Sequence, residues 1–428
     1  MSINSKLSEL HSVGKNIKVS LIGAGLMGKG MVSQMMLMKG MTPSLVVSNN
    51  INDAIESYTL AGIDKKDIKI AKNLKDVNIA MEAGKFVVSD QTDLGSAANL
   101  VDVVVDATGS PEAGAKIAMD SILNKKHIVM VNVEADVTVG PILNKLAKNA
   151  GLVYTGTAGD EPGSVKEIYD FADALGFEII AIGKGKNNPI DFAANPDTVR
   201  ETALSKNLKP LRLASFVDGT NTMIEMAAMS NSTGFIPDIR GAHGVHSGVK
   251  ELSNIFRLKK DGGILENIGV VDYVHGIAPG VFAVVSTSLE QIHTEMKYLS
   301  MGDGPNYVLY RPYHLTSLET PITVANAYFY NEATIAPIDG LVSEVVTIAK
   351  LDLKEGEYLD GIGEFKVLGT IEEYEKAKTQ NLLPIGLVNR KTRVKKAIKK
   401  GEFITYDMVE LDKTSYIYKL RQMQEAIF

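Results

Sequence analysis

The sequence predicts an α/β protein with an N-terminal doubly wound parallel sheet, a central α+β domain and a small C-terminal β domain. Residues 1–155 alternate apolar, β-branched runs with helical segments, the order that a parallel sheet covered by helices requires. Residues 156–333 mix helices and strands without that alternation. Residues 334–428 hold short strands and two Gly-Glu turns before a final helix at 416–428. We therefore expect three domains with boundaries near residues 155 and 333.

A glycine turn organises the first domain. An apolar run that begins at Ile17 leads into the turn, and residues 31–38 are expected to form an apolar helix after it. In such a strand–turn–helix unit the first glycine allows the tight turn, the second lets the backbone approach a pyrophosphate, and the third lets the helix pack on the strand. The helix N-terminus also favours phosphate. The pattern predicts a dinucleotide site formed by Gly23, Gly25, Leu26, Met27 and Gly28.

The other elements follow in order. Further strands of the first domain are expected at 45–48, 86–89, 101–106, 127–133 and 152–154, and helices at 52–62 (capped by Asn52), 74–84, 112–123 and 139–149. In the central domain we expect a helix over 165–175 and a strand over 178–182. Segments 349–357 and 395–402 resemble each other weakly, which suggests two similar halves in the C-terminal domain.

The end of the second strand bears on the choice of dinucleotide. An NAD site usually places Asp or Glu there to bind the ribose hydroxyls. This chain has Ser48, Asn49 and Asn50, which lack a carboxylate that would repel a 2′-phosphate and can hydrogen-bond it. No arginine is present either. The tripeptide favours NADP over NAD.

Two more strand ends point to the same edge of the sheet. Ala107, Thr108 and Gly109 follow a buried strand, and they either lie along the cofactor or form a simple strand-to-helix turn. Asn132 and Glu134 close the next strand, and we expect Asn132 to contact the cofactor. Glu134 is expected to face the site because a carboxylate buried without a partner is costly.

A lysine–asparagine loop is expected at the exit of the 178–182 strand. Lys184, Lys186, Asn187 and Asn188 gather two amines and two amides there, and the intervening glycines would let a ligand approach. A lysine near the reacting carbon polarises a carbonyl or shuttles a proton if its pKa is lowered. The alternative is a pair of solvent-exposed loop lysines.

Acidic residues provide further candidates. Asp160 and Glu161 precede a helix, where they either bind a divalent cation or complement the helix N-terminus. Glu225 and Asp218 are expected on a helix with its polar side toward the site, although alone they would be ordinary polar surface.

Two further segments carry histidine. Arg311, Tyr313 and His314 gather a cation, a phenol and an imidazole, which either bind an anion and supply an acid or base, or pack at a domain junction. His243 and His246 have the spacing of a metal pair, but no third soft ligand accompanies them, so we do not expect zinc.

Composition excludes several classes of function. The 428 residues are 45% hydrophobic and 22% charged, with a net charge of −6 that gives no support to nucleic-acid or membrane binding. The basic cluster at 390–400 is interpreted as a solvated face. Without cysteine there is no disulfide, thiolate metal site or cysteine nucleophile. No apolar run is long enough to span a bilayer, and residues 1–15 lack a signal-peptide core, so we expect a cytoplasmic protein. We also expect a homo-oligomer.

These motifs together resemble a known family. The chain is similar to the homoserine-dehydrogenase-like group of NAD(P)-binding oxidoreductases with a C-terminal SAF domain, and within it to the deoxyxylulose-phosphate-reductoisomerase-like enzymes. The resemblance runs from Ile17 to the C-terminal helix. It rests on Gly-Ala-Gly-Leu-Met-Gly (23–28), Asp-Ala-Thr-Gly (106–109), Val-Asn-Val-Glu-Ala-Asp-Val-Thr (131–138), Ala-Gly-Asp-Glu-Pro (158–162), Gly-Lys-Gly-Lys-Asn-Asn-Pro (183–189), Met-Ile-Glu-Met-Ala-Ala (223–228) and Arg-Pro-Tyr-His-Leu-Thr-Ser-Leu-Glu (311–319).

The resemblance implies an NADP(H)-dependent reductase or reductoisomerase for a small sugar or polyol phosphate. An example is the conversion of 1-deoxy-D-xylulose 5-phosphate to 2-C-methyl-D-erythritol 4-phosphate in isoprenoid precursor synthesis. It implies a SAF domain of β-clip fold at 334–428, and it places Lys184 or Lys186 near the reacting carbinol. The reductoisomerase-like members carry arginines where this chain has Ser48-Asn49-Asn50. No motif assigns metal carboxylates, so a divalent cation, Mg²⁺ or Mn²⁺, is left open.

We expect hydride transfer at the carboxyl edge of the first sheet, with substrate held by the loops at 158–164, 183–189 and 311–319. Lys184 or Lys186 is expected as acid/base or carbonyl polariser, with Glu134, Asp160 and Glu161 orienting the substrate or an ion. The alternatives are a homoserine or related semialdehyde dehydrogenase and a non-catalytic protein that senses NADP or a sugar.

Overall fold

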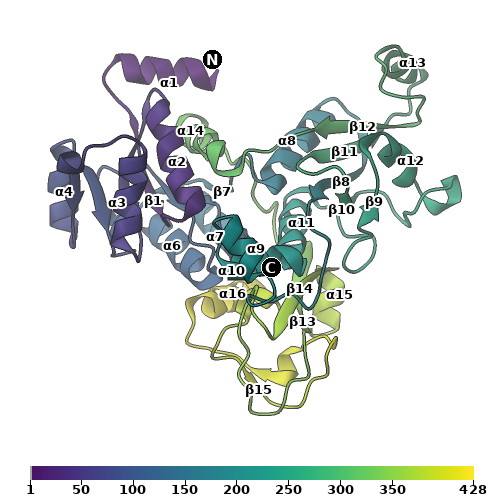
Figure 1. Ribbon diagram of the computed structural model, residues 1–428. Coiled ribbons are helices and arrows are strands. Elements are labelled where there is room, and N and C mark those ends of the chain that lie inside the picture. Colours follow the sequence, from purple (N-terminus) through teal and green to yellow (C-terminus); the bar gives the residue numbers. More distant parts are fainter. Residues whose placement is uncertain (1) are drawn as a thin grey trace. The chain divides into compact units, whose positions relative to one another are not determined.

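The computed structural model describes residues 2–428, which divide into two compact units (Figure 1). The first unit takes in the chain through Asp160 together with Leu315–Ala336 and Ser415–Phe428. The second takes in Glu161–His314 and Pro337–Thr414. The division into three domains stays a prediction.

The first unit is built on a seven-stranded sheet in which every neighbouring pair is parallel. The strand order is β3-β4-β2-β1-β5-β6-β7, so the chain leaves β1 toward one side and later returns to its other side. Such a switch point is where doubly wound sheets bind ligands. The predicted α/β class is confirmed, and the strands are β1 (Ile17–Ile22), β2 (Met41–Val47), β3 (Ile68–Ile70), β4 (Phe86–Ser89), β5 (Val103–Asp106), β6 (His127–Met130) and β7 (Tyr154–Gly156).

Helices cover this sheet, and two of them come from much later in the sequence. The apolar side chains of β1 and β5 pack with Met31, Met35 and Val324 in one core. The helices are α1 (Ile3–Ser12), α2 (Leu26–Leu37), α3 (Ile51–Leu60), α4 (Leu74–Glu82), α5 (Leu94–Ala97), α6 (Pro111–Leu123), α7 (Val133–Asn149), α14 (Thr320–Tyr330) and α16 (Tyr416–Ile427), with short 3-10 turns at Lys65–Asp67 and Thr316–Leu318.

Helix α7 begins six residues before the predicted start at 139. Gly140 and Pro141 look like a helix start, but Pro141 lies inside the helix. The side chain of Gln424 on α16 bridges the weakened turn: its Oε1 accepts from the Ile142 backbone N–H at 3.1 Å, and its Nε2 donates to the Thr138 carbonyl at 3.3 Å. The helix therefore continues through a glycine–proline pair because a segment about 280 residues away satisfies its backbone.

The second unit contains a five-stranded mixed sheet in the order β12-β11-β8-β10-β9. Strand β8 is central, parallel to β10 and antiparallel to β11. It runs to Lys186 rather than ending at 182, because β10 pairs with it across the glycine-rich part. The strands are β8 (Glu178–Lys186), β9 (Val245–His246), β10 (Val270–His275), β11 (Val281–Ser286) and β12 (Asn306–Arg311).

The glycines of β8 serve packing. A Cβ on Gly183 would lie 1.9 Å from the Asp272 carbonyl oxygen, and one on Gly185 would lie 2.4 Å from the Ala278 nitrogen. Successive side chains of a strand point to opposite faces. In the Gly-Lys-Gly-Lys pattern the two glycines therefore face the crowded backbone on one side of the sheet, where a side chain would not fit. The two lysines project from the other side.

Helices and a small β segment complete the second unit. The helices are α8 (Glu161–Ala174), α9 (Arg200–Ser205), α10 (Pro210–Val217), α11 (Thr220–Thr233), α12 (Leu252–Ile255), α13 (Glu290–Tyr298) and α15 (Tyr374–Thr379), with 3-10 turns at Val249–Glu251, Lys259–Asp261, Ile385–Leu387 and Tyr406–Met408. The β segment pairs β13 (Ser343–Ala349) with β14 (Val367–Glu373), and β15 (Arg393–Val394) with β16 (Val409–Glu410). The weakly similar halves meet directly, because Leu353 and Ile398 exchange backbone hydrogen bonds of 2.8 and 3.0 Å.

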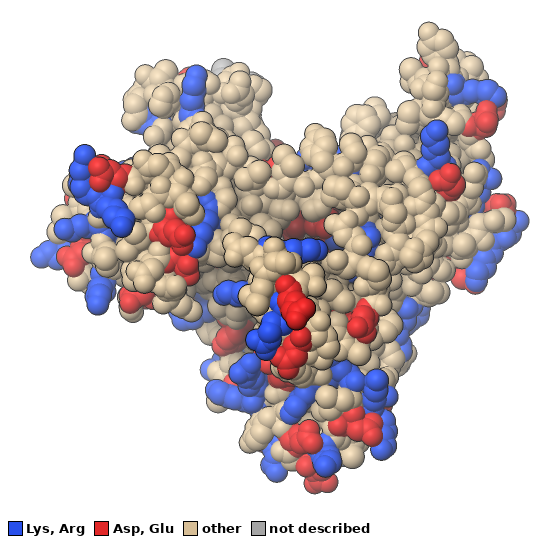
Figure 2. All heavy atoms as spheres, viewed as in Figure 1, with Lys and Arg blue, Asp and Glu red and all other residues tan. Residues whose placement is uncertain are grey.

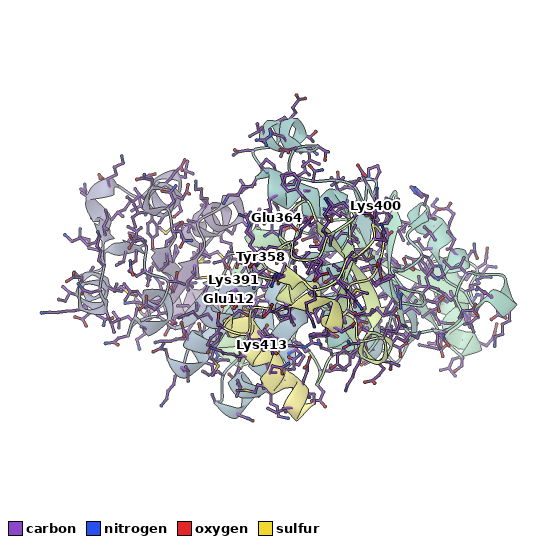
Figure 3. All side chains as sticks on the ribbon, turned by 90° about the horizontal axis from the view of Figure 1, so that it is seen from below. Glu112, Tyr358, Glu364, Lys391, Lys400 and Lys413 are labelled. Carbon is purple, nitrogen blue, oxygen red and sulfur yellow. The ribbon has the colours of Figure 1, made fainter. Side chains whose placement is uncertain are left out.

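The basic cluster at 390–400 is interspersed with acids. In Figure 2 blue and red side chains mix over the C-terminal segment, and Figure 3 labels Glu364, Lys391 and Lys400 on it. Its ion pairs are Arg390–Glu364 at 2.9 Å, Lys391–Asp412 at 3.2 Å, Lys396–Asp407 at 2.8 Å and Lys399–Asp352 at 3.3 Å. Within residues 2–428, none of the helices has the length and apolar character needed to cross a membrane.

Candidate active site

The predicted nucleotide turn joins β1 directly to α2. Helix α2 begins at Leu26, five residues earlier than predicted, with Gly25 as an N-cap that offers no side-chain hydrogen bond to the first turn. A Cβ on Gly25 would meet no heavy atom of the described chain within 4 Å, whereas one on Gly28 would lie 2.1 Å from the Gly23 carbonyl oxygen. Leu26 and Met27 are exposed beside it. The turn thus leaves open space and free helix N–H groups where a phosphate would sit.

A second turn packs against the first. A Cβ on Gly23 would lie 2.6 Å from the carbonyl oxygen of Ala107, so only glycine allows the two turns to approach this closely. Thr108 donates to Asp106 Oδ1 from its backbone N–H at 2.9 Å and from its hydroxyl at 2.7 Å. Gly109 adopts a left-handed φ of 66° that completes the turn.

Asn132 lies behind this second turn. Its buried amide donates to Asp106 Oδ2 at 3.0 Å and to the Ser110 carbonyl at 2.8 Å, and its Oδ1 caps α7. Burial raises the pKa of Asp106 to about 6, although hydrogen bonds from Thr108 and Asn132 oppose the shift. Glu134 is buried in the first turn of α7 rather than at the end of β6, and its expected role at the site stays a prediction.

The tripeptide after β2 lies at the surface and leads into α3. Asn49 is exposed, while Asn50 rather than the predicted Asn52 caps α3 through a 3.2 Å bond from the Asn52 N–H. Ser48 accepts from the Asn50 N–H at 3.3 Å. Lys29, which the sequence analysis did not single out, lies nearby on α2 and forms ion pairs with Asp53 at 2.9 Å and Glu56 at 2.7 Å. The ammonium of Lys29 is therefore already neutralised by two carboxylates.

In the second unit, the lysines predicted in a loop project from one face of β8 and are 5% and 6% exposed, so they are not solvent-exposed loop lysines. Lys184 Nζ donates to Glu161 Oε1 at 2.7 Å and also to Glu225 Oε2. Burial disfavours its charged form, but the two carboxylates outweigh burial and hold the pKa of Lys184 well above its usual value. Lys184 therefore stays an ammonium across the neutral range.

Lys186 has a different environment. Its Nζ donates to the Phe216 carbonyl at 2.9 Å and to Thr222 Oγ1 at 3.4 Å. Burial, followed by the charge of Lys184, lowers the pKa of Lys186 to about 8. A lysine with this pKa exchanges its proton near neutral pH, which suits an acid or base.

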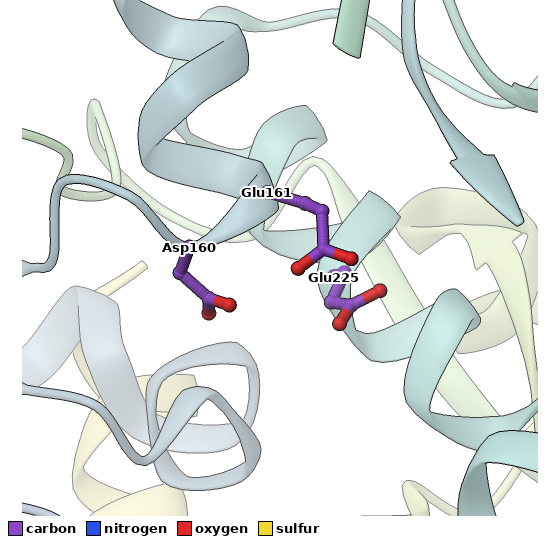
Figure 4. Close-up of side chains that lie close together, drawn as sticks. All are labelled: Asp160, Glu161 and Glu225. Carbon is purple, nitrogen blue, oxygen red and sulfur yellow. The ribbon is translucent and has the colours of Figure 1, made fainter. Parts of the chain in front are cut away.

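Helix α11 supplies the second carboxylate of the cluster. Glu225 is buried, and its Oε1 accepts from Asn221 Nδ2 at 2.6 Å. Burial and then the charge of Glu161 raise the pKa of Glu225 to about 7. In Figure 4 the carboxylates of Glu161 and Glu225 lie close together, and Asp160 is the residue before Glu161 in the chain, at the end of the first unit.

The 311–314 segment contacts the cluster of Lys184, Glu161 and Glu225 through His314. His314 Nε2 lies 3.5 Å from Glu161 Oε1, on the strand exit after β12. Arg311 forms an ion pair with Glu167 Oε2 at 3.0 Å and stacks over the Tyr313 ring at 4.7 Å. The structure thus brings Lys184, Glu161, Glu225 and His314 together, and it places Asn187 exposed and Asn188 half-buried just past the end of β8.

Two family models match the chain. Residues 23–155 match the model described as homoserine dehydrogenase, NAD binding domain. Residues 159–320 match the model described as oxidoreductase DRL, catalytic domain. The chain is an NAD(P)-dependent oxidoreductase. The glycine turn lies in the NAD-binding match, and Lys184, Lys186 and Glu225 lie in the catalytic match of this oxidoreductase.

Solved structures similar to the oxidoreductase share little sequence with it. A probable dehydrogenase from Thermotoga maritima is 14% identical, with 75% of this chain and 90% of that chain covered and a TM-score of 0.40. A scyllo-inositol dehydrogenase from Lactobacillus casei with bound NAD(H) and scyllo-inositol is 12% identical, with 69% and 76% covered and a TM-score of 0.37. A putative myo-inositol dehydrogenase from Sinorhizobium meliloti 1021 is 12% identical, with 70% of each chain covered and a TM-score of 0.34. Among curated proteins no sequence matches.

Sequence reasoning missed one positioning residue and misjudged the surroundings of another. Asp106 holds the second turn, and the Asp-Ala-Thr-Gly motif contained the signal. Asp218, first interpreted as a polar helix residue, is fully buried and pairs with Lys350 Nζ at 2.6 Å. No local pattern announces that pair, because its two members lie more than a hundred residues apart.

Proposed function

We propose that the chain is an NADP(H)-dependent reductase or reductoisomerase for a small sugar or polyol phosphate, with Lys186 as the proton-exchanging group. The observation that carries this proposal is the pair of lysines on one face of β8. Lys184 is fixed as an ammonium by two carboxylates, and the pKa of Lys186 is lowered to about 8. A permanent cation can polarise a carbonyl oxygen, and a titrating amine beside it can give that oxygen a proton when the carbonyl is reduced. In the oxidising direction the amine takes the proton from the alcohol.

The residues divide the work between them. When bound, the nicotinamide supplies or accepts the hydride. An ammonium carries three N–H groups, and Lys184 uses two on Glu161 and Glu225, so one is left to polarise the substrate oxygen. Lys186 gives its proton to that oxygen in the reducing direction and takes it back in the oxidising direction. His314, which contacts Glu161, orients the carboxylate that holds Lys184.

The cofactor preference rests on the tripeptide after β2. Asn49 is exposed and uncharged, so a 2′-phosphate meets no like charge from Ser48, Asn49 or Asn50. Changing Asn49→Asp should weaken NADP(H) binding at least tenfold and leave NAD(H) binding equal or stronger, as followed by the quenching of protein fluorescence. Equal loss of both cofactors would contradict the preference.

We also consider a divalent cation bound by the carboxylates around Lys184. Mg²⁺ or Mn²⁺ prefers carboxylate oxygens, which Glu161 and Glu225 provide. Both carboxylates are bound to Lys184, however, so a cation would have to displace the ammonium. We derive no catalytic step through a metal. Titration with Mn²⁺ should give weak binding to the wild-type chain and tighter binding to Lys184→Met, which frees both carboxylates.

Turnover tests the proposal directly. Purified protein is offered 1-deoxy-D-xylulose 5-phosphate and related sugar and polyol phosphates with NADPH or NADP⁺, and absorbance at 340 nm is followed. Lys184→Met and Lys186→Met should each lower kcat by about 10²–10⁴, the usual contribution of a positioned acid or base, while cofactor titration stays unchanged. The control is Lys259→Met, because Lys259 is exposed and paired with Glu266. Near-normal turnover in both lysine variants would remove them from the mechanism.

A second candidate is a homoserine or related semialdehyde dehydrogenase, which the match of residues 23–155 favours. The same assay with homoserine and with aspartate semialdehyde separates the two. A non-catalytic sensor would bind NADP(H) and give no absorbance change with any of these substrates. For residues 334–428 we infer a SAF-like β-clip domain, supported by the direct pairing of Leu353 with Ile398 from the two similar halves.

A further inference from the structure

Three basic side chains lie side by side at the ends of three strands. Lys186 on β8 pairs in register with His275 on β10, and His275 pairs in register with His246 on β9. The strands are parallel, and residues paired in register project from the same face. The cationic row, as we call Lys186, His275 and His246, therefore lies at the carboxyl ends of adjacent parallel strands, where open α/β sheets commonly bind ligands.

The two imidazoles are held in place by packing. Their ring centroids are 4.4 Å apart with the planes 13° from parallel, and the Tyr273 ring meets His275 edge-on at 5.6 Å. The residues that follow them approach closely: a Cβ on Gly276 would lie 2.7 Å from the Ser247 carbonyl oxygen. Stacked rings at fixed strand ends present their ring N–H groups at little ordering cost on binding.

Within the described chain, the two histidines of this row have no acidic partner. Among residues 2–428, neither His246 nor His275 forms an ion pair with a carboxylate, whereas His243 pairs with Asp238 and His314 with Glu161.

The surroundings disfavour the charged form of His275. Burial, then His246, then Lys186 lower the pKa of His275. The carboxylates that act on Lys186 are Glu225, Asp218 and Glu161, which Lys184 or Lys350 already binds. An anion that binds among these basic side chains would favour their charged forms.

We propose that the histidine end of the cationic row, His275 and His246, binds the terminal phosphate of the substrate, while Lys186 faces the reacting carbonyl. The inference rests on the proposed function and deepens it. It differs from the expectation for Arg311, whose guanidinium is already paired with Glu167 and stacked on Tyr313. Neighbouring strands are about 4.8 Å apart, so the imidazoles lie roughly 5 and 10 Å along the sheet from Lys186. A carbon chain of four or five atoms spans the shorter of these distances, from a reacting carbonyl to a phosphate beside His275.

Inorganic phosphate tests the row without any assumption about turnover. The full chain is titrated with phosphate by calorimetry and by NMR of ring-labelled histidines. We expect shifts at two of the histidines, and at least tenfold weaker binding in His246→Gln and His275→Gln. His11→Gln, on the exposed helix α1, should bind phosphate as the wild type does. Unchanged affinity in both row variants would overturn the inference.

Kinetics then separate this inference from the proposed function. With a sugar phosphate, His246→Gln should raise KM at least tenfold with kcat within about twofold, and with the unphosphorylated sugar the variant and the wild type should behave alike. Equal rises in KM for both substrates would overturn the row as a phosphate site while leaving the proposed reductase in place. If no sugar phosphate is turned over, the proposed function fails and the phosphate titration still decides the row. Because His246 is exposed, its variant carries the test even if His275→Gln does not fold.

Discussion

Lys184 and Lys186 project from the same face of one strand, yet Lys184 binds a charged partner and Lys186 binds a neutral one. Lys184 Nζ lies 2.7 Å from a Glu161 carboxylate oxygen, whereas Lys186 Nζ donates to the neutral carbonyl of Phe216 at 2.9 Å. The carboxylate raises the pKa of Lys184. The neutral carbonyl does not oppose burial, which lowers the pKa of Lys186. Two identical side chains, two residues apart, thereby acquire different chemistry.

The pH dependence of turnover should report Lys186. Its pKa of about 8 means that the ammonium is present below that pH and the amine above it. As proton donor in reduction, it predicts that kcat/KM falls about tenfold per pH unit above pH 8. As proton acceptor in oxidation, it predicts a rise up to that pH and a plateau beyond. Rates measured in both directions between pH 6 and 10 check this, and an identical profile in Lys186→Met would contradict it.

Substitutions at two glycines of the nucleotide turn should affect cofactor affinity and the free energy of unfolding differently. Gly25→Ala adds a methyl group into open space, so the free energy of unfolding should change by less than about 1 kcal/mol while NADP(H) affinity falls at least tenfold. Gly28→Ala drives its methyl against the Gly23 carbonyl at 2.1 Å and should cost about 1–3 kcal/mol or more. Urea unfolding and fluorescence titration measure the two effects. Tight cofactor binding by Gly25→Ala would show that the pyrophosphate does not approach there.

The bridge from α16 to α7 should be visible in stability. In Gln424→Leu the Ile142 N–H loses its acceptor beside Pro141, and a buried unpaired N–H costs about 1–3 kcal/mol. Thr138 keeps the bond from Arg421 to its carbonyl, so the loss is confined to one group. The matched control is Gln422→Leu on the exposed side of α16, which should unfold as the wild type does. Equal midpoints of urea unfolding for the two variants would show that the bridge contributes nothing.

The buried Lys350–Asp218 pair should tie the C-terminal β segment to the catalytic helix of the same unit. Lys350 Nζ also donates to the carbonyls of Ala194 at 2.7 Å and Glu364 at 2.9 Å, and Asp218 Oδ1 accepts from the Thr220 N–H at the start of α11. Lys350→Met leaves a buried carboxylate unpaired and should cost about 3–5 kcal/mol. Lys399→Met removes an exposed pair with Asp352 and should cost less than about 1 kcal/mol. Denaturant unfolding compares them, and equal costs would refute the assignment.

Local signals explain which parts of the fold were predictable. The strands and helices of the first sheet follow contiguous periodic runs, and their existence was predicted with errors mainly at the ends. The sequence predicts a shorter helix α7 because the Gly-Pro pair is typical of a helix start, and nothing nearby reveals that Gln424 will supply the missing acceptor. Strand β8 was cut short because glycine is rare inside strands, and only the crowding by Asp272 and Ala278 explains its presence there.

The sequence by itself determined the nucleotide turn, because G-x-G-x-x-G acts through the backbone of adjacent residues and needs no distant partner. It also singled out Lys184, Lys186, Glu161 and Glu225 as polar groups worth testing. Only the tertiary structure decided that Glu161 and Glu225, 23 and 41 residues away from Lys184, converge on one ammonium. It likewise decided that Lys186, His275 and His246 share one row. A pKa and an anion site depend on burial and on neighbours in space, and folding alone brings those neighbours together.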